Sequence, residues 1–322
     1  MKIHLSNYDY LRNFDVFLRS FTTSDPGKLH VTTNDKWINA HPAVLAAVAG
    51  LGLSMGSDNV TFDEITAKSG HYLDAMGLFK ILKKESPFKI VTHEPAGRYI
   101  PLTQIRTPKE QTHFIHDMIP LLHLEPSKAD AIKYTVGELV RNVLEHADAK
   151  NGAIVAAQYS KEQGVIRLGI CDTGMGIRNS MRHIWPSRTH TDLDAIKWAL
   201  VPGVSGTTTR EGGTAENAGA GLFFVKSISM VTRNYFMIYS GTGVYKLLKR
   251  RPDVRSIRLN ANPDSDRNSQ TDSAPNFPGT LIAIDITLEK IDEFAALLEM
   301  IRNAYSSAVK ARRKERFTPR FI

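Results

Sequence analysis

Residues 136–146 read VGELVRNVLEH, and this stretch organises the fold expected for the second half of the chain. On a helix, with 100° between residues, Glu138, Asn142 and Glu145 fall on one face and His146 lies just beside it. The apolar side is supplied by Leu139, Val140, Val143 and Leu144. The side-chain oxygen of Asn142 is a hard ligand suited to Mg²⁺ bound next to phosphate oxygens, and Glu138 could orient or deprotonate a water molecule. A solvated amphipathic face is the alternative interpretation of this helix alone.

A glycine-containing turn follows a β-like run further along the chain. Residues 171–177 read CDTGMGI, and Gly174 and Gly176 allow a tight turn and the close approach of a ligand. Asp172, at the end of the run, could accept a hydrogen bond from an exocyclic amine such as that of adenine. By itself this pattern is also common in ordinary turns and calcium loops.

Two further segments have the chemistry of ligand contacts. Residues 211–228 read EGGTAENAGAGLFFVKSI, so glycines precede an apolar helix. Backbone N–H groups at such a helix start can bind a phosphate, although many glycine loops of this kind are simple caps. Residues 278–280 open a late strand, and the hydroxyl of Thr280 could reach a base.

Hydrophobic periodicity predicts the elements around these motifs. In the second half, helices are expected at 108–122, 127–146, 222–231 and 288–313. Strands are expected at 153–159, 165–171, 235–240, 245–248 and 279–286, with residues 263–278 as an exposed loop. In the first half, strands are expected at 30–33 and 89–92, and helices at 43–53 and 62–76. We therefore expect two α/β domains, residues 1–105 and residues 106–322.

The order and spacing of the four motifs resemble the four boxes of the GHKL superfamily, the ATPases of the gyrase, chaperone, histidine-kinase and MutL type. The resemblance covers about residues 136–286 and implies a Bergerat-type α+β sandwich, in which a mixed sheet is backed by helices. ATP would be held beneath a lid formed by residues 178–217.

The resemblance also implies a role for each motif residue. Asn142 would bind Mg²⁺, and Glu138 would be a general base or a polarising carboxylate. Asp172 would bind the adenine amine, with Thr280 nearby. The remaining cofactor-binding residues are glycines of the base pocket and backbone donors to the phosphates: Gly174, Gly176, Gly219, Ala220, Gly221 and Leu222. Candidate phosphate partners are Arg210 and Lys226.

A closer resemblance involves the runs NVLEHA, CDTGMGIRNSM, DLDAIKWALVPGVSGT and NAGAGLFFVKSI. They are similar to bacterial ATP-binding proteins related to anti-sigma-factor serine kinases. The N-terminal region of such proteins often looks like a STAS fold, and WINAHPAVLAAVAGLGL followed by ITAKSGHYLDAMGLF is similar to that pattern. Residues 40–43 carry no Ser or Thr acceptor, which departs from a phosphorylatable STAS domain. The resemblance implies a protein partner, STAS-like or another regulatory protein, and allows a homodimer.

Composition sets broader limits. The net charge of +8 and the basic stretches 246–258 and 302–320 permit contact with nucleic acid, but they do not favour it over other partners. The single cysteine, Cys171, fits a reducing compartment. The nearly uncharged stretch 40–60 reads as a small-residue helix and loop and not as a membrane span. We therefore expect a cytoplasmic protein without a membrane segment.

Three functions remain open: an ATP-dependent regulator that phosphorylates a partner on Ser or Thr, an ATP-gated dimerising ATPase, and a non-catalytic nucleotide-gated binding module. Glu138 favours an active enzyme, because a carboxylate beside a terminal phosphate serves little purpose in a passive site. The mechanical ATPase is weakened because only about 35 residues follow Ile286. A histidine kinase is less favoured, since the helix with His116 lacks a second long partner helix. We expect an ATP- and Mg²⁺-binding regulator of the anti-sigma-kinase-like type, with phosphotransfer or slow hydrolysis.

Overall fold

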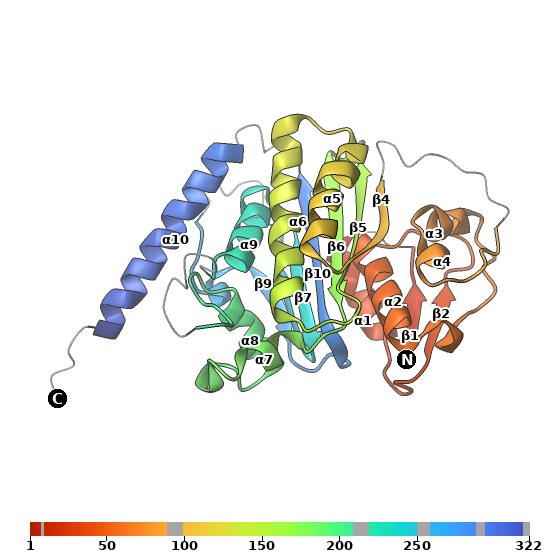
Figure 1. Cartoon of the computed structure of the whole chain (residues 1–322), viewed down its shortest axis with the longest axis horizontal. Helices are drawn as coiled ribbons and strands as arrows, with labels where there is room; N and C mark the ends of the chain where they lie inside the picture. The colour runs from red at the N-terminus through yellow and green to blue at the C-terminus, as the bar shows by residue number, and fades with distance from the viewer. Residues whose placement is uncertain (8–9, 89–98, 209–218, 250–257, 288–293, 318–322) are drawn as a thin grey trace.

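The structure is a computed structural model that describes residues 1–7, 10–88, 99–208, 219–249, 258–287 and 294–317. Two β-sheets lie in separate layers with helices between and outside them (Figure 1). The mixed α/β class expected from the sequence is therefore observed. Among the described residues, no helix is both long and apolar enough to cross a membrane.

The larger sheet has seven strands in the order β4-β5-β6-β10-β7-β8-β9. The strands are β4 (Tyr99–Ile105), β5 (Ala153–Ser160), β6 (Val165–Asp172), β7 (Phe236–Gly241), β8 (Gly243–Leu247), β9 (Asn268–Thr271) and β10 (Phe277–Thr287). Each pair of neighbouring strands is antiparallel. The sheet is therefore antiparallel throughout, and the expectation of a mixed sheet is wrong. β6 and β7 run in the same direction, but β10 lies between them and runs the opposite way. β9 was also missed, since its polar sequence, NSQT, reads as loop.

One face of this sheet is covered by α6 (Pro126–His146) and α9 (Gly221–Val231). Side chains alternate between the two faces, because successive residues of a strand point to opposite sides. On β10, Ile282, Ile284 and Ile286 face α6 and α9, whereas Leu281 and Ala283 belong to the core on the other side. The expected helices 127–146 and 222–231 and the expected hairpin of β5 and β6 are confirmed within one or two residues.

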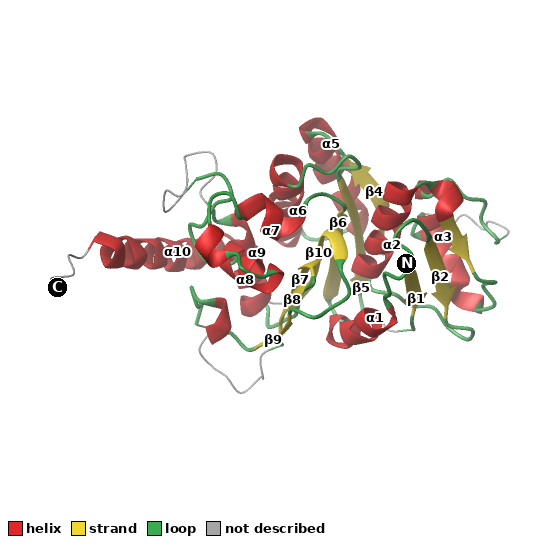
Figure 2. Ribbon diagram, turned by 90° about the horizontal axis from the view of Figure 1, so that it is seen from below, coloured by secondary structure: helices red, strands yellow, loops and turns green. Residues whose placement is uncertain are grey.

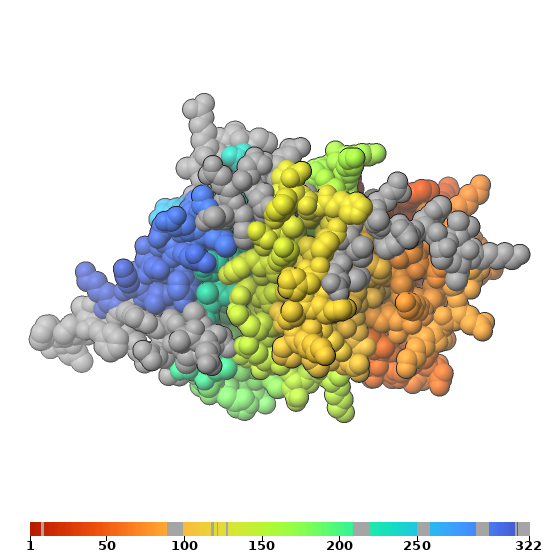
Figure 3. All heavy atoms as spheres, turned by 45° about the horizontal axis from the view of Figure 1, so that its top comes forward, coloured from red at the N-terminus to blue at the C-terminus, as the bar shows by residue number. Residues whose placement is uncertain are grey.

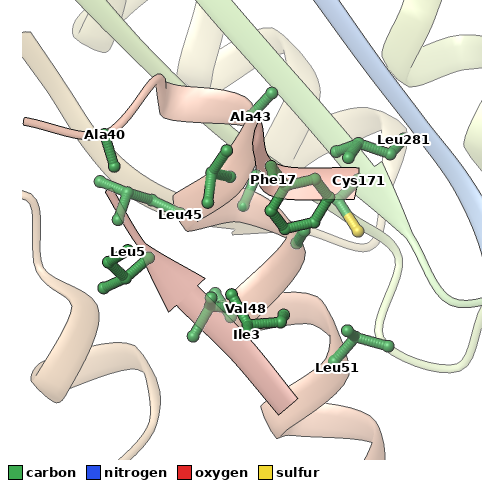
Figure 4. Packing of buried hydrophobic residues seen from close by; sticks show 14 of the residues in the cluster. Ile3, Leu5, Phe17, Ala40, Ala43, Leu45, Val48, Leu51, Cys171 and Leu281 are labelled. Atoms are coloured by element: carbon green, nitrogen blue, oxygen red, sulfur yellow. The ribbon is translucent and has the colours of Figure 1, made fainter. Parts of the chain in front are cut away.

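The second face of the sheet is covered by α2 (Pro42–Met55), a helix that is apolar all round. α2 lies between the two sheets (Figures 1 and 2), and eleven of its fourteen residues are buried. Small residues permit this close packing. A Cβ on Gly50 would lie 2.8 Å from the sulfur of Cys171, and a Cβ on Gly169 would overlap the backbone of Ala43. Figure 4 shows the resulting core, in which residues of α2 lie between β1 and the larger sheet.

The smaller sheet consists of three parallel strands in the order β1-β2-β3, which are Lys2–Leu5, Leu29–Thr33 and Val60–Phe62. Around it lie α1 (Phe14–Ser20), α3 (His71–Ala75) and α4 (Leu78–Ile81). The expected helix at 62–76 is wrong over its first part, because Val60–Phe62 pairs with β2 and the Asp63 N–H extends that ladder to Val31. The expected strand at 89–92 lies outside the described residues. The STAS-like character of this region stays a prediction.

The expected domain boundary at residues 105 and 106 does not separate two cores. β4, which ends at Ile105, is an edge strand of the larger sheet. α2 and the smaller sheet share a core with Cys171, Met237 and Leu281 of the larger sheet. A buried contact joins the two parts as well: His41 Nε2 lies 3.1 Å from Asp285 Oδ1, and the Ala43 N–H donates to His41 Nδ1.

The remaining helices are α5 (Pro108–His113), α7 (Gly176–Met181), α8 (Asp192–Ala199) and α10 (Phe294–Phe317). α5 continues as a helical segment to Leu122, as expected, through a π-helical and a 3₁₀ turn. α7 and α8 lie in the region expected to form a lid. α10 packs beside α9 and α6, and the space-filling view shows α6 between the N-terminal residues and α10 (Figure 3).

Candidate functional site

A cavity of about 330 Å³ opens between α6, the end of β6, α7 and the start of α9. Nine of the ten residues that the four motifs supply line it, and the two basic candidates, Arg210 and Lys226, are described below. They are Glu138, Asn142, Asp172, Gly176, Gly219, Ala220, Gly221, Leu222 and Thr280. The tenth, Gly174, lies on the opposite side of its turn and lines a neighbouring depression. Segments that are separated by up to 140 residues in sequence therefore meet in one cavity.

The wall formed by α6 carries the polar face that the helical spacing predicted. Glu138, Asn142 and His146 line the cavity together with the apolar Leu139 and Val143. The side chain of Glu138 is 14% exposed, and its Oε2 lies 2.6 Å from Nη2 of Arg141. Burial raises the pKa of Glu138, and the nearby Arg141 guanidinium opposes this shift. Burial also lowers the pKa of His146.

At the other end of the cavity, Asp172 is held by neighbours in the sheet. Thr280 stands opposite Asp172 in the ladder between β6 and β10, so the two residues meet at the same edge. The Gly174 N–H donates to Asp172 Oδ1 at 2.9 Å. Asp172 is only 3% exposed, and burial raises its pKa to about 6, although hydrogen bonds from Gly174 and Thr280 lower it. A carboxylate in this position is a buried hydrogen-bond acceptor directed at the cavity.

The turn after β6 needs its glycines for packing. Gly176 has a φ of +76°, a conformation that favours glycine. A Cβ on Gly174 would overlap the carbonyl of Ala147 at the end of α6, and the Met175 N–H donates to that same carbonyl at 2.8 Å. The turn is thereby attached to α6, which fixes the distance between Asp172 and the polar helix face.

The glycine segment at the start of α9 forms the wall opposite α6. Gly219 has a φ of +63°, and its carbonyl accepts a hydrogen bond from the Gly203 N–H at 2.9 Å. A Cβ on Gly221 would lie 2.6 Å from Glu138 Oε2, so a larger residue would fill the space beside that carboxylate. The N–H groups at the start of α9 are thus close to Glu138 and Asn142, and a helix start favours anions.

Several residues of the cavity were missed by the sequence reasoning. Tyr134 and Arg141 lie on the cavity face of α6, four residues before and three residues after Glu138, so helical spacing alone could have found them. Ala199, the last residue of α8, and Val204, Ser205 and Gly206 after it also line the cavity. They lie in the expected lid and within the run DLDAIKWALVPGVSGT, but none of them was expected as a site residue.

The expected role of Lys226 as a phosphate partner is wrong. Its Nζ lies 2.6 Å from Asp266 Oδ2 and also donates to the carbonyl of Asn260, and both charged side chains are fully buried. On α9, position 226 is about 140° around the helix from Gly221, which lines the cavity. The other candidate, Arg210, lies outside the described residues. His116 is exposed and does not line the cavity.

The side chains that line the cavity suit a cation that is coordinated mainly by a bound molecule and by water, with few protein ligands. Within the described part of the chain, no group of three or more His, Cys, Asp or Glu residues could form a metal site by itself. Mg²⁺ in nucleotide sites commonly takes one or two protein oxygens and completes its shell with phosphates and water. Asn142, which lines the cavity opposite the start of α9, offers such an oxygen.

No model of a known protein family matches the sequence, and no curated protein matches it either.

Proposed function

We propose that this chain binds ATP with Mg²⁺ in the cavity between α6 and α9, and that it controls a partner protein by Ser/Thr phosphotransfer or slow hydrolysis. One observation carries the proposal. Four segments with nucleotide-binding chemistry line a single cavity, with nine of their ten motif residues on its surface, although the candidate phosphate partner Lys226 is paired with Asp266. Coincidence is a poor explanation, because the segments belong to different elements.

The distribution of chemistry along the cavity supports a nucleotide. Asp172 and Thr280 offer polar groups beside Ile282 and Val143, which suits a flat base with an exocyclic amine. The start of α9 offers backbone N–H groups at the other end, which suits phosphates. On the α6 wall, Glu138 and Ala147, the C-cap of α6, are nine residues apart, or roughly 13 Å along the helix axis. The cavity therefore has room for a base, a sugar and a phosphate chain in that order.

Asn142 would hold Mg²⁺ at the phosphate end, where bound Mg²⁺ would neutralise charge on the phosphate oxygens. Glu138 would accept the proton of the attacking hydroxyl or water. Its partial burial favours this role, since burial raises the pKa of Glu138 and makes it a stronger base than an exposed carboxylate. A Ser or Thr hydroxyl from a partner would have to enter from the mouth of the cavity, where Arg141 and Glu145 are partly exposed.

Calorimetric titration with ATP and Mg²⁺ tests the binding, and γ-labelled ATP tests the chemistry. Asn142→Ala should abolish Mg²⁺-dependent ATP binding, whereas Asn303→Ala, an exposed asparagine on α10, should not change it. Glu138→Ala should retain binding and lose turnover. Label on a partner protein indicates a kinase, and released phosphate alone indicates an ATPase. Absence of ATP binding by the unmodified chain would refute the proposal.

A further inference from the structure

The described residues that line the cavity supply little positive charge for a triphosphate. Among the described residues that line it, Arg141 is the one lysine or arginine, while Glu138 and Asp172 are both acidic. Lys226, which the sequence offered as a phosphate partner, is buried in an ion pair with Asp266. Backbone N–H groups at a helix start supply only partial charge. A basic side chain at the phosphate end therefore has a large effect on which nucleotide binds.

Arg141 lines the cavity on the same helix as Glu138 and Asn142. It follows Glu138 by three residues and directly precedes Asn142, so it lies at the rim of the polar face of α6. Its side chain is 44% exposed, with Nη2 at 2.6 Å from Glu138 Oε2 and Nε at 4.0 Å from Glu145 Oε1. A rim position of this kind allows the guanidinium to move without disturbing the core.

The ordinary interpretation is an i,i+3 surface ion pair, which contributes little to stability. Two features favour a further role. Glu138 is largely buried, and it lies against Gly221 at the start of α9, so the pair lies inside the cavity mouth and not on an outer helix face. A guanidinium also binds phosphate with two parallel hydrogen bonds, and a phosphate offers more charge and more oxygens than a carboxylate.

We propose that Arg141 binds the terminal phosphate of the bound nucleoside triphosphate and leaves Glu138 when it does so. This inference rests on the proposed function and adds the residue that distinguishes the triphosphate from the diphosphate. Without a terminal phosphate, Arg141 neutralises Glu138 and occupies its Oε2. With a terminal phosphate, the guanidinium exchanges one anionic partner for another, and Glu138 becomes free to accept a proton. No covalent bond changes in this exchange.

The test compares Arg141→Gln with Arg141→Lys and with Lys133→Gln. Lys133 is a matched control, because it also lies on α6, pairs with Asp130 at i,i−3 and is 41% exposed, yet does not line the cavity. Dissociation constants are measured by calorimetry with Mg²⁺ for a non-hydrolysable ATP analogue, ADP and adenosine. Arg141→Gln should weaken binding of the ATP analogue about tenfold or more, and it should change the affinity for ADP and for adenosine less than about threefold. Arg141→Lys should restore part of the loss, and Lys133→Gln should bind as the unmodified chain does.

A double variant distinguishes direct contact between Arg141 and the terminal phosphate from an indirect effect of Arg141 on the charge of Glu138. In a Glu138→Gln background, replacing Arg141 with Gln should still weaken binding of the ATP analogue about tenfold. If the loss disappears in that background, Arg141 acts only by neutralising Glu138 and the inference is overturned. Equal losses for all three ligands, or no loss, would overturn it as well, while leaving the proposed function intact. Absence of binding by the unmodified chain would instead overturn the proposed function, and this inference with it.

Discussion

Protonation of Asp172 tests whether this carboxylate accepts a hydrogen bond from the base of a bound nucleotide. Burial raises the pKa of this carboxyl to about 6. The group is therefore about nine-tenths ionised at pH 7 and about one-tenth ionised at pH 5. If the carboxylate accepts a hydrogen bond from the exocyclic amine of a base, affinity follows the ionised fraction. Adenosine should then bind about tenfold more weakly at pH 5 than at pH 7, which is about 1.4 kcal/mol of binding free energy.

Adenosine is the suitable ligand because it has no phosphate that titrates in this range. Calorimetry at pH 5, 6 and 7 gives the dissociation constants, and circular dichroism at each pH shows that the protein stays folded. Asp172→Asn is the control, since an amide does not titrate and its affinity should be flat with pH. A tenfold change that persists in Asp172→Asn would refute the reasoning, as would equal affinity of the unmodified chain at pH 5 and pH 7.

The same pKa shift predicts a change in stability of the ligand-free protein. The pKa of Asp172 is about 6 when folded, against 3.8 for an unperturbed aspartate. The folded state therefore binds more protons between these values, so this group makes the free energy of unfolding fall as pH rises, by at most about 3 kcal/mol. The loss is complete above pH 6. Urea unfolding at pH 4 and pH 7 measures it as the free energy of unfolding of the unmodified chain minus that of Asp172→Asn. This difference should be larger at pH 4, and a difference that is larger at pH 7 would contradict the assigned sign.

Three further predictions concern the packing around the cavity. Gly169→Ala would bring a Cβ into the backbone of α2 and should cost about 3 kcal/mol in urea unfolding, whereas Gly137→Ala, with no contact closer than 3.8 Å, should be neutral or stabilising by up to about 1 kcal/mol. Lys226→Met leaves the buried Asp266 without its ion-pair partner and should cost about 3–5 kcal/mol, with partial recovery when that aspartate is also replaced by leucine. Arg312→Ala removes a 2.7 Å hydrogen bond to the loop after α8 and should speed amide exchange in that loop.

Much of the site could be predicted because its signals are local. The spacing of Glu138 and Asn142 is a property of one helix, and Gly174, Gly176 and Gly219 reflect turns that a larger residue would strain or block. Such patterns can be recognised without knowing what packs against them. The expectation that Lys226 binds phosphate was wrong because it depended on a contact between residues that are distant in the sequence. A lysine close to a glycine-rich helix start is a plausible phosphate ligand from the sequence, and only the tertiary position of Asp266 shows that it is buried in an ion pair.

The arrangement of the two sheets could not be predicted in the same way. The sequence of α2 indicates a small-residue helix, but an evenly apolar helix does not show which surface it covers. Its packing partner includes Gly169, more than a hundred residues later, and the close contact is visible only when both are in place. The expected boundary after residue 105 falls at the end of β4, and the sequence does not show that this strand belongs to the larger sheet.

The same two strands connect the cavity with the N-terminal layer. β6 ends at Asp172 and β10 begins near Thr280, so both strands place a polar residue at the same end of the cavity. The opposite face of these strands is covered by α2, and His41 at the start of that helix contacts Asp285 of β10. Because the packing is too close for a side chain at Gly169, α2 cannot shift across the sheet without moving β6.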